Sequence, residues 1–352
     1  MRQTFRSILA GSLTLVVCAS GCGKGSTDTA AEGKPKVGIV LSSTNVSSVK
    51  ELGAGFAAGA QEAGGEAVVT GPPINDPPKQ SEMFKEMTGN AKSGISIQAS
   101  NAELIAKQLS EAGKDGIPLL AVGTKPAQTS GVKGFVSANN FELGRQLAVE
   151  IAKKLPAGAK GTVVLGLTRP GLPTHDDRGS GIRAGLAEKL PAVRVLGPFD
   201  TQIDATANLA AWKRLVAANP KALAFLGSGA NDSVNLATVR AETKGKWLAG
   251  GFDADPRALK AIKDGRMAVL ASPEHFLQGS VAGWLQVRAA KDGKPLPEGW
   301  IEVPGLMITS ANVDEILKRQ ESDAAKLAWF KPHIDKITGN LSTYTKPLDK
   351  AH

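Results

Sequence analysis

Few side chains of this sequence are suited to covalent or metal chemistry. It contains 4 His, at positions 175, 275, 333 and 352, and 2 Cys, which are Cys18 and Cys22. The densest group of potential metal ligands is the tripeptide His175-Asp176-Asp177. Zinc needs ligands that converge on it, and neighbouring side chains of one loop cannot all face one ion. We therefore expect no metal site.

The glycine-rich segments do not match a cofactor-binding or catalytic motif. The run Leu-Gly-Ser-Gly-Ala-Asn at 226–231 carries part of a dinucleotide-binding turn but lacks its third glycine. The sequence contains no Gly-Lys-Ser/Thr phosphate loop and no Gly-x-Ser-x-Gly nucleophile elbow. No nucleophile is clearly paired with a base. We therefore expect a protein that is not an enzyme and has no cofactor.

The chain is long for a single core. It has 352 residues, of which 42% are hydrophobic and 21% charged, as in folded proteins. Cores stop growing near ~250 to 300 residues, so we expect two domains. From Lys36 onward, short β-branched runs alternate with helical stretches. The first set contains predicted strands at 37–41, 67–70, 94–97 and 117–122, with helices at 80–90 and 102–112.

The same alternation restarts after Ala138. The second set contains predicted helices at 142–154, 181–189, 207–218 and 233–242, and predicted strands at 162–167, 194–196, 222–226 and 247–252. Such units pack as a parallel sheet with helices on both faces. The predicted fold class is α/β, with two doubly wound parallel-sheet lobes joined by a multi-strand hinge. Open sheets of this kind bind ligands beyond the carboxyl ends of their strands, so we expect a cleft between the lobes.

The first residues have the pattern of an export signal. Arg2 and Arg6 precede an apolar segment at 8–19, and small residues lead to Cys22. The Ala-Ser-Gly-Cys ending resembles the lipobox of bacterial lipoproteins, which implies lipidation of Cys22 and a membrane anchor. A plain secretory signal with a free Cys is the alternative. We predict a signal peptide at 1–21 and a flexible tether at 22–35, and hence an extracytoplasmic location.

The positive charge balance does not indicate a nucleic-acid partner. There are 42 Lys and Arg against 33 Asp and Glu. The basic residues are scattered, with no run of five and no interleaved aromatic residues. A solvated basic surface is the better interpretation, and we expect no nucleic acid as a partner.

Several motifs together carry a resemblance to a known family. In order and spacing, the segments 37–40, 116–120, 135–145, 231–232 and 250–265 resemble the ribose-type periplasmic binding proteins. This is the type I, sugar-binding group of receptors that serve ABC importers. The resemblance implies a Venus-flytrap protein that binds a small ligand, performs no chemistry on it and delivers it to a membrane permease. We expect the protein to be a monomer.

The resemblance also implies ligand-binding residues on the second lobe. It assigns a sugar-binding role to Arg178, because a guanidinium can donate to two vicinal hydroxyl groups. Asn231 and Asp253 follow predicted strands and match the family's ligand-binding amide and carboxylate. The alternatives are an exposed Arg at a helix start, a helix N-cap for Asn231 and a turn residue for Asp253. Asp232 is expected to cap its helix.

The first lobe and the hinge supply the remaining candidates. Thr44 and Asn45 follow the first predicted strand, where the family has a polar and aromatic loop, but the aromatic pair is missing. The hinge loop near 271–276 offers Glu274 as an acceptor for sugar hydroxyls and Phe276 as a stacking ring. The alternative places Phe276 in the core and Glu274 in water.

These observations lead to one functional hypothesis. We expect an N-terminal lobe at 36–139 and 276–303, a C-terminal lobe at 140–275, and a hinge return with a C-terminal extension at 304–352. The protein is expected to capture a monosaccharide between the lobes and deliver it to an ABC permease. The alternatives are a receptor subunit for a chemoreceptor or sensor kinase, and a ligand such as a nucleoside or an amino acid.

Overall fold

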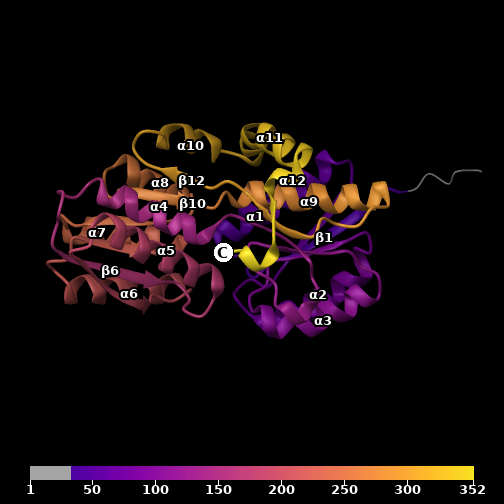
Figure 1. The fold of residues 1–352 in the computed structure, drawn as a ribbon, viewed down its shortest axis with the longest axis horizontal. Coiled ribbons are helices and arrows are strands. Elements are labelled where there is room, and N and C mark those ends of the chain that lie inside the picture. The colour runs from indigo at the N-terminus through magenta and orange to yellow at the C-terminus, as the bar shows by residue number, and fades with distance from the viewer. Residues whose placement is uncertain (1–32) are drawn as a thin grey trace, which may run out of the picture. The chain divides into compact units, whose positions relative to one another are not determined.

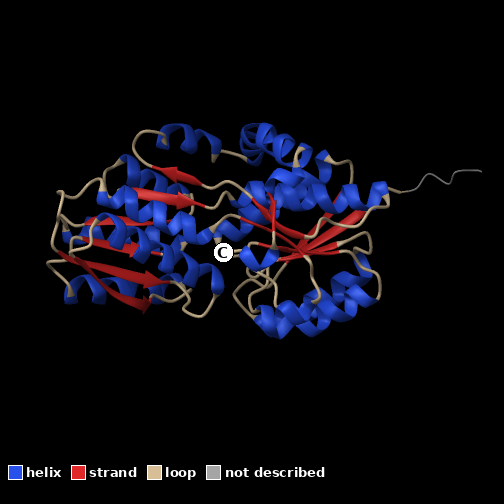
Figure 2. Cartoon of the chain, viewed as in Figure 1, coloured by secondary structure: helices blue, strands red, loops and turns tan. Residues whose placement is uncertain are grey.

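The computed structural model describes residues 33–352, which form two α/β lobes, each built on its own sheet (Figures 1 and 2). The predicted signal peptide, Cys22 and most of the predicted tether lie outside the described residues. No helix among residues 33–352 is long and apolar enough to span a bilayer. The predicted fold class is confirmed.

The first lobe contains a seven-stranded sheet in the order β13-β11-β5-β4-β3-β1-β2. Its strands run parallel except β13, which is antiparallel to β11. Their bounds are β1 (Lys36–Val40), β2 (Glu66–Thr70), β3 (Ile95–Ile97), β4 (Leu119–Val122), β5 (Gly134–Ser137), β11 (Gly299–Glu302) and β13 (Thr345–Lys346). Thus strands from three separate parts of the chain form one sheet.

Helices cover both faces of this sheet, as Figure 2 shows. One buried cluster lies under α1 and α9 and includes Leu52, Phe56 and Val281. A second lies under α2 and α3 and includes Phe84 and Leu109. The helices of this lobe are α1 (Ser47–Glu62), α2 (Pro77–Asn90), α3 (Ala102–Lys114), α9 (His275–Asp292), α11 (Asp323–Gly339) and α12 (Leu341–Tyr344).

The second lobe contains a six-stranded sheet in the order β12-β10-β9-β8-β6-β7, with β12 antiparallel to β10. Its strands are β6 (Gly161–Leu167), β7 (Val193–Asp200), β8 (Ala224–Gly227), β9 (Leu248–Phe252), β10 (Val269–Ser272) and β12 (Leu306–Ile308). Its helices are α4 (Asn140–Ala152), α5 (Pro173–Lys189), α6 (Ala205–Ala218), α7 (Ala230–Thr243), α8 (Pro256–Lys263) and α10 (Val313–Arg319). Buried clusters on both faces of the sheet hold α4 and α5 on one side and α6, α7 and α8 on the other.

The helix α5 begins at Pro173, eight residues before the predicted start at 181. The sequence around Gly179 and Gly181 has low helix propensity, so the sequence pattern does not predict the first turns of this helix. These glycines serve packing instead. A Cβ on Gly181 would lie 1.9 Å from the carbonyl oxygen of Phe141 in α4. Because glycine has no side chain, α4 and α5 can approach each other closely at this position. This close packing fixes the position of Arg178 on α5.

Four segments cross between the lobes. Three of them connect β5 to α4, β10 to α9, and β11 to β12. The fourth, at 320–322, connects α10, which packs on α8, to α11, which packs on α9. In Figure 1 these two helices lie over different lobes.

The fourth crossing is held by a buried ion pair. Nη1 of Arg319 donates to Oε2 of Glu274 at 2.6 Å, and both residues are buried, at 3% and 4% exposed. The next residue, Gln320, donates through Nε2 to the carbonyl oxygen of Ala254 at 3.0 Å and to Oε1 of Glu51 at 3.3 Å. Because Glu51 lies on α1 and Ala254 follows β9, Gln320 bridges the two lobes.

Candidate functional site

A cavity of about 120 Å³ lies between the lobes, beyond the carboxyl ends of the strands. Both lobes contribute polar side chains to its wall. The first lobe contributes Ser42, Ser43, Asn75, Gln98, Ser100 and Thr124. The second lobe contributes Thr168, Arg169, Thr174, His175, Arg178, Asn231 and Asp253, and His275 lines the cavity from the start of α9.

Arg178 is fixed on three sides. Its Nε donates to Oδ1 of Asn140 at 2.9 Å, and its Nη1 donates to the carbonyl oxygen of Ser228 at 2.7 Å. The guanidinium lies over the ring of Phe252, 4.4 Å from the ring centroid. Burial lowers the pKa of Arg178 from its usual value, and the nearby Asp253 opposes this effect. The side chain is therefore held rigidly, with Nη2 left free of these contacts.

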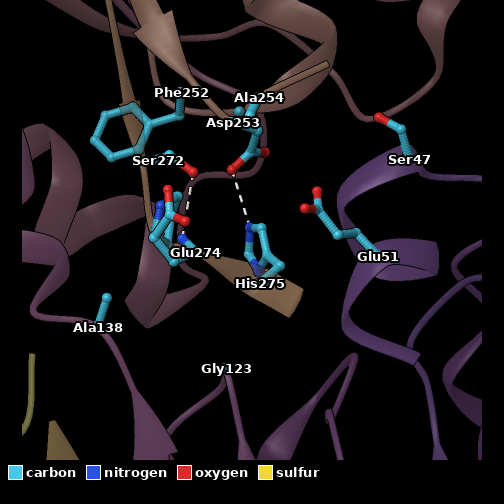
Figure 3. A network of polar contacts seen from close by, with 12 residues as sticks. Ser47, Glu51, Gly123, Ala138, Phe252, Asp253, Ala254, Ser272, Glu274 and His275 are labelled. Carbon is cyan, nitrogen blue, oxygen red and sulfur yellow. Dashed lines mark hydrogen bonds and ion pairs between the residues drawn. The ribbon is translucent and has the colours of Figure 1, made fainter. Parts of the chain in front are cut away.

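Asp253 stands next to Arg178 and carries the negative charge of the cavity. It lies in the left-handed backbone region, at φ 72°, directly after β9. Its Oδ1 accepts a hydrogen bond from Nε2 of His275 at 3.0 Å (Figure 3). The same oxygen lies 4.0 Å from Nη1 of Arg178. Burial alone would raise the pKa of Asp253, but His275 and Arg178 outweigh burial and lower it to about 2. Asp253 is therefore ionised at neutral pH.

His175 is neutral in this environment. Burial, followed by the positive charge of Arg178, lowers its pKa to about 3. Its Nδ1 lies 2.8 Å from Oγ of Ser228, and that oxygen accepts the backbone N–H of Thr168 at 3.0 Å. The hydroxyl of Ser228 can donate to Nδ1 or accept a second hydrogen bond from it, so this contact forms with either neutral tautomer of His175.

A buried carboxylate supports the second-lobe wall from behind. Oδ2 of Asp232 accepts hydrogen bonds from Thr168 Oγ1 and from the backbone N–H groups of Ser228 and Gly229. Asp232 thus caps the start of α7, as predicted, and holds the loops that carry Thr168 and His175. Nδ2 of Asn231, on the first turn of α7, donates to the carbonyl oxygen of Ile203 at 2.8 Å, which leaves its Oδ1 free to accept.

On the first lobe, two glutamines organise the wall. Oε1 of Gln98 accepts from Oγ of Ser42 at 3.0 Å, so its amide nitrogen is free to donate. The buried Gln80 donates to the carbonyl oxygen of Gln98 and accepts from the backbone and hydroxyl of Ser100. These contacts fix the loop after β3 at the edge of the cavity.

Besides the contact of His275 with Asp253, three further hydrogen bonds of the described residues join the lobes near the cavity. Nη1 of Arg169 donates to the carbonyl oxygen of Ser100 at 3.1 Å. Oγ1 of Thr174 donates to the carbonyl oxygen of Gly123 at 3.1 Å. Oγ of Ser47, on α1, donates to Oδ2 of Asp255 at 3.0 Å. The two lobes therefore contact each other directly in this structure.

The structure brings together three of the predicted ligand-binding residues, since Arg178, Asn231 and Asp253 all line the cavity. Thr44 and Asn45 are outside its lining, so their predicted place in the wall is wrong. The hydroxyl group of Thr44 donates to the carbonyl oxygen of Pro72, and Asn45 is exposed. The chain turns away from the cavity after Ser43.

The predicted hinge ligands are also corrected. Phe276 is fully buried in the first-lobe core and stacks on Phe330, with 5.7 Å between the ring centroids. Glu274 points to Arg319 and not into the cavity. The hinge loop is shorter than expected, because α9 begins at His275 and turns Phe276 toward the core. No aromatic ring of Phe, Tyr or Trp lines the cavity among residues 33–352.

Sequence reasoning missed His275, Arg169 and Gln98. Each follows a strand, β10, β6 and β3 respectively, so the rule that ligands bind beyond the carboxyl ends of strands would have found them. In the sequence, His175 stands out only as a possible metal ligand. Among the described residues, no group of three or more His, Cys, Asp or Glu side chains is placed to hold a metal ion.

Comparisons with known proteins agree with this architecture. A family model described as "Periplasmic binding protein domain" matches residues 37–295. The chain is 27% identical over 210 residues to the ribose import binding protein of Bacillus subtilis, covering 59% of this chain and 66% of the relative. It is 27% identical over 197 residues to the ribose import binding protein of Salmonella typhimurium, covering 55% and 64%. The matches thus span less than two thirds of these relatives.

Solved structures share the fold at low sequence identity. An arabinose binding protein from Geobacillus stearothermophilus matches with a TM-score of 0.69 and 22% identity, covering 81% of this chain and 99% of that one. A carbohydrate transporter solute binding protein from Agrobacterium radiobacter, in complex with D-arabinose, matches with a TM-score of 0.74 and 21% identity, covering 82% and 100%.

Proposed function

Because the chain belongs to the periplasmic binding protein domain family, we propose that it is an extracytoplasmic solute-binding protein. It captures a small polar ligand, of the monosaccharide class, in the cavity between its lobes. It then presents the closed form to the permease of an ABC importer. It performs no chemistry on the ligand.

The observation that carries this proposal is the pair formed by Arg178 and Asp253. Both side chains are buried, and both retain hydrogen-bonding atoms that their protein contacts leave free. A guanidinium donates hydrogen bonds and a carboxylate accepts them, and a sugar hydroxyl group can both accept from the first and donate to the second. A cavity of about 120 Å³ restricts the ligand to a small molecule.

Closure of the lobes is the proposed mechanism. The ligand contacts side chains of both lobes, such as Gln98 and Arg178, so it binds the closed form more tightly than an open one. The contacts of Arg169 and Thr174 across the cavity mouth add to the stability of the closed form. The permease distinguishes the two forms by the relative positions of the lobes.

The chain's location follows from its first residues. We propose that 1–21 is a removed signal peptide, that Cys22 carries a lipid anchor and that 22–35 tethers the lobes to the membrane. The protein acts as a monomer, without a nucleic-acid partner. Mass spectrometry of the first peptide of the exported protein would detect a diacylglycerol group on Cys22 or its absence.

A ligand screen tests the proposed function. Purified protein is heated with pentoses, hexoses, polyols, nucleosides and amino acids, and a ligand at ~100 times its dissociation constant should add ~2.7 kcal/mol of stability. We expect a monosaccharide-class compound to raise the melting temperature, and we expect Arg178→Gln to abolish the rise. Asn45→Ala is the matched control, since Asn45 is exposed outside the cavity wall. A rise only with nucleosides or amino acids would contradict the ligand class.

A further inference from the structure

The charges on the cavity wall point to a more specific ligand. We propose that the ligand is a sugar acid, a polyhydroxylated compound with one carboxylate, and that Arg169 and Arg178 bind the carboxylate. This inference rests on the proposed function and narrows it. Nothing in the sequence motifs singled out Arg169, which lies on the loop between β6 and α5.

The cavity wall carries an excess of positive charge. Two guanidinium groups, those of Arg169 and Arg178, face it, whereas Asp253 is its one carboxylate among residues 33–352. His175 is neutral, so it adds no charge to the wall. A neutral sugar bound here would leave the half-buried guanidinium of Arg169 without a counterion where solvent access is reduced, which costs free energy. A carboxylate on the ligand removes that cost.

The free donors are placed to receive an anion. Nε and Nη1 of Arg178 are occupied by Asn140 and Ser228, but Nη2 has no partner among residues 33–352. Arg169 uses only Nη1, toward the carbonyl oxygen of Ser100. Planar guanidinium groups bind carboxylates through two parallel hydrogen bonds. Arg178 lies 4.0 Å from Asp253, and Arg169 has no acidic partner among the described residues, so the free donors of these two groups on one wall form a carboxylate site.

The single carboxylate of the wall is already engaged. Oδ1 of Asp253 accepts from Nε2 of His275 at 3.0 Å, and Asp253 is also the nearest acid to Arg178. Asp253, together with the buried Asp232 behind the wall, therefore balances the charge of Arg178, and Arg169 is the guanidinium left without a counterion. Arg169 has no ion-pair partner among the described residues.

The rest of the wall suits hydroxyl groups rather than a stacked ring. The hydroxyl protons of Thr168 and Thr174 are donated to protein acceptors, so their oxygen atoms remain free to accept from ligand hydroxyls. No Phe, Tyr or Trp side chain of the described residues lines the cavity to pack on the apolar face of a pyranose. A ligand held by charge and hydroxyl contacts fits this wall better than one held by stacking.

Matched ligands test the proposal with the whole chain. Titration calorimetry compares galacturonate with its methyl ester, and ribonate with ribose, at neutral pH and at two salt concentrations. We expect each acid to bind about 10- to 100-fold more tightly than its neutral partner. Arg169→Gln should weaken binding of the acids about 10-fold more than binding of their neutral partners, which lose only the contact of Arg169 with Ser100 across the lobes, and Arg169→Lys should restore part of the preference. Arg266→Gln is the control, because Arg266 pairs with Asp264 outside the cavity wall.

The outcomes separate this inference from the proposed function. If the neutral partners bind as tightly as the acids, the carboxylate assignment is overturned while solute binding stands. The same follows if Arg169→Gln weakens acids and neutral sugars equally. If folded protein binds neither acids nor neutral sugars, the proposed ligand class fails as well.

Discussion

At the residue scale, His175 is a buried ionisable group whose charge state the cavity controls. Its pKa of about 3 lies below the ~6.5 of a histidine in an unfolded chain, because burial and Arg178 disfavour the imidazolium. The folded protein therefore keeps His175 neutral while the unfolded chain takes up a proton. This contribution to stability is complete above pH ~6.5 and is lost as the pH falls toward 3.

The variant His175→Asn tests this linkage, since an amide oxygen can still accept from Ser228. Between pH 7.5 and pH 4.5 the wild type should lose about 2–3 kcal/mol more unfolding free energy than this variant, at ~1.4 kcal/mol per pH unit. Urea unfolding at both pH values gives the difference. His333→Asn, at an exposed position of α11, is the control and should follow the wild type. Equal losses in wild type and His175→Asn would contradict the assignment.

The sequence identifies those cavity residues that follow the carboxyl end of a predicted strand. Arg178, Asn231 and Asp253 reach the cavity because the segments that follow β6, β8 and β9 begin at one edge of the sheet. Glu274 and Phe276 also follow a strand, β10, but the helix α9 begins at once and rotates both side chains away from the cavity. Sequence pattern places a loop, whereas the direction of each side chain depends on where the next helix starts.

At the element scale, the contact of α4 with α5 decides where Arg178 lies. Gly181 faces the carbonyl oxygen of Phe141, and Gly144 faces the carbonyl oxygen of Arg178, with no space for a Cβ at either position. Substitution Gly181→Ala should separate the helices, lower the unfolding free energy by about 1–3 kcal/mol and weaken ligand binding by displacing Arg178.

The matched control is Gly89→Ala, because Gly89 lies in α2 and a Cβ added there would meet no neighbouring atom within 4 Å. Alanine at this position should be neutral or stabilise by up to about 1 kcal/mol through helix propensity. Urea unfolding and ligand titration of both variants provide the comparison. If Gly181→Ala is as stable as Gly89→Ala and binds ligand normally, close helix packing does not position Arg178.

The glycines of α5 also explain why the sequence predicts too short a helix. Local propensity is low across Gly179, Ser180 and Gly181, yet the tertiary contact with α4 stabilises the helix from Pro173 onward. The helix α9 is absent from the sequence prediction, which places a hinge loop where this helix starts. Parallel strands and their order of alternation are visible in the sequence because they depend on local runs of β-branched residues.

At the scale of the whole molecule, two lobes follow from the restart of strand–helix alternation near residue 140, but the fourth crossing does not. The sequence predicts 304–352 only as a hinge return and an extension. In the structure β12 joins the second sheet and β13 the first, so the chain crosses again between α10 and α11. Sheet membership depends on long-range pairing, which short segments of sequence do not encode visibly.

The fourth crossing should limit how far the lobes separate. Arg319 and Gln320 tie it to Glu274, Glu51 and Ala254, so opening must stretch a short, anchored segment. Inserting Gly-Ser-Gly-Ser between Glu321 and Ser322 lengthens that segment and leaves these contacts in place. We expect a larger radius of gyration without ligand and a several-fold weaker ligand affinity, because the binding-competent closed form is less populated.

Small-angle X-ray scattering with and without ligand measures both states of the insertion variant. The ligand-bound scattering should match the wild type, since the closed form is unchanged, so the whole effect lies in the free protein. The same insertion between Lys294 and Pro295, in an exposed loop within the first lobe, controls for added length. If both insertions give the wild-type radius of gyration without ligand, the fourth crossing does not restrain opening, and the three other crossings alone set the range of motion.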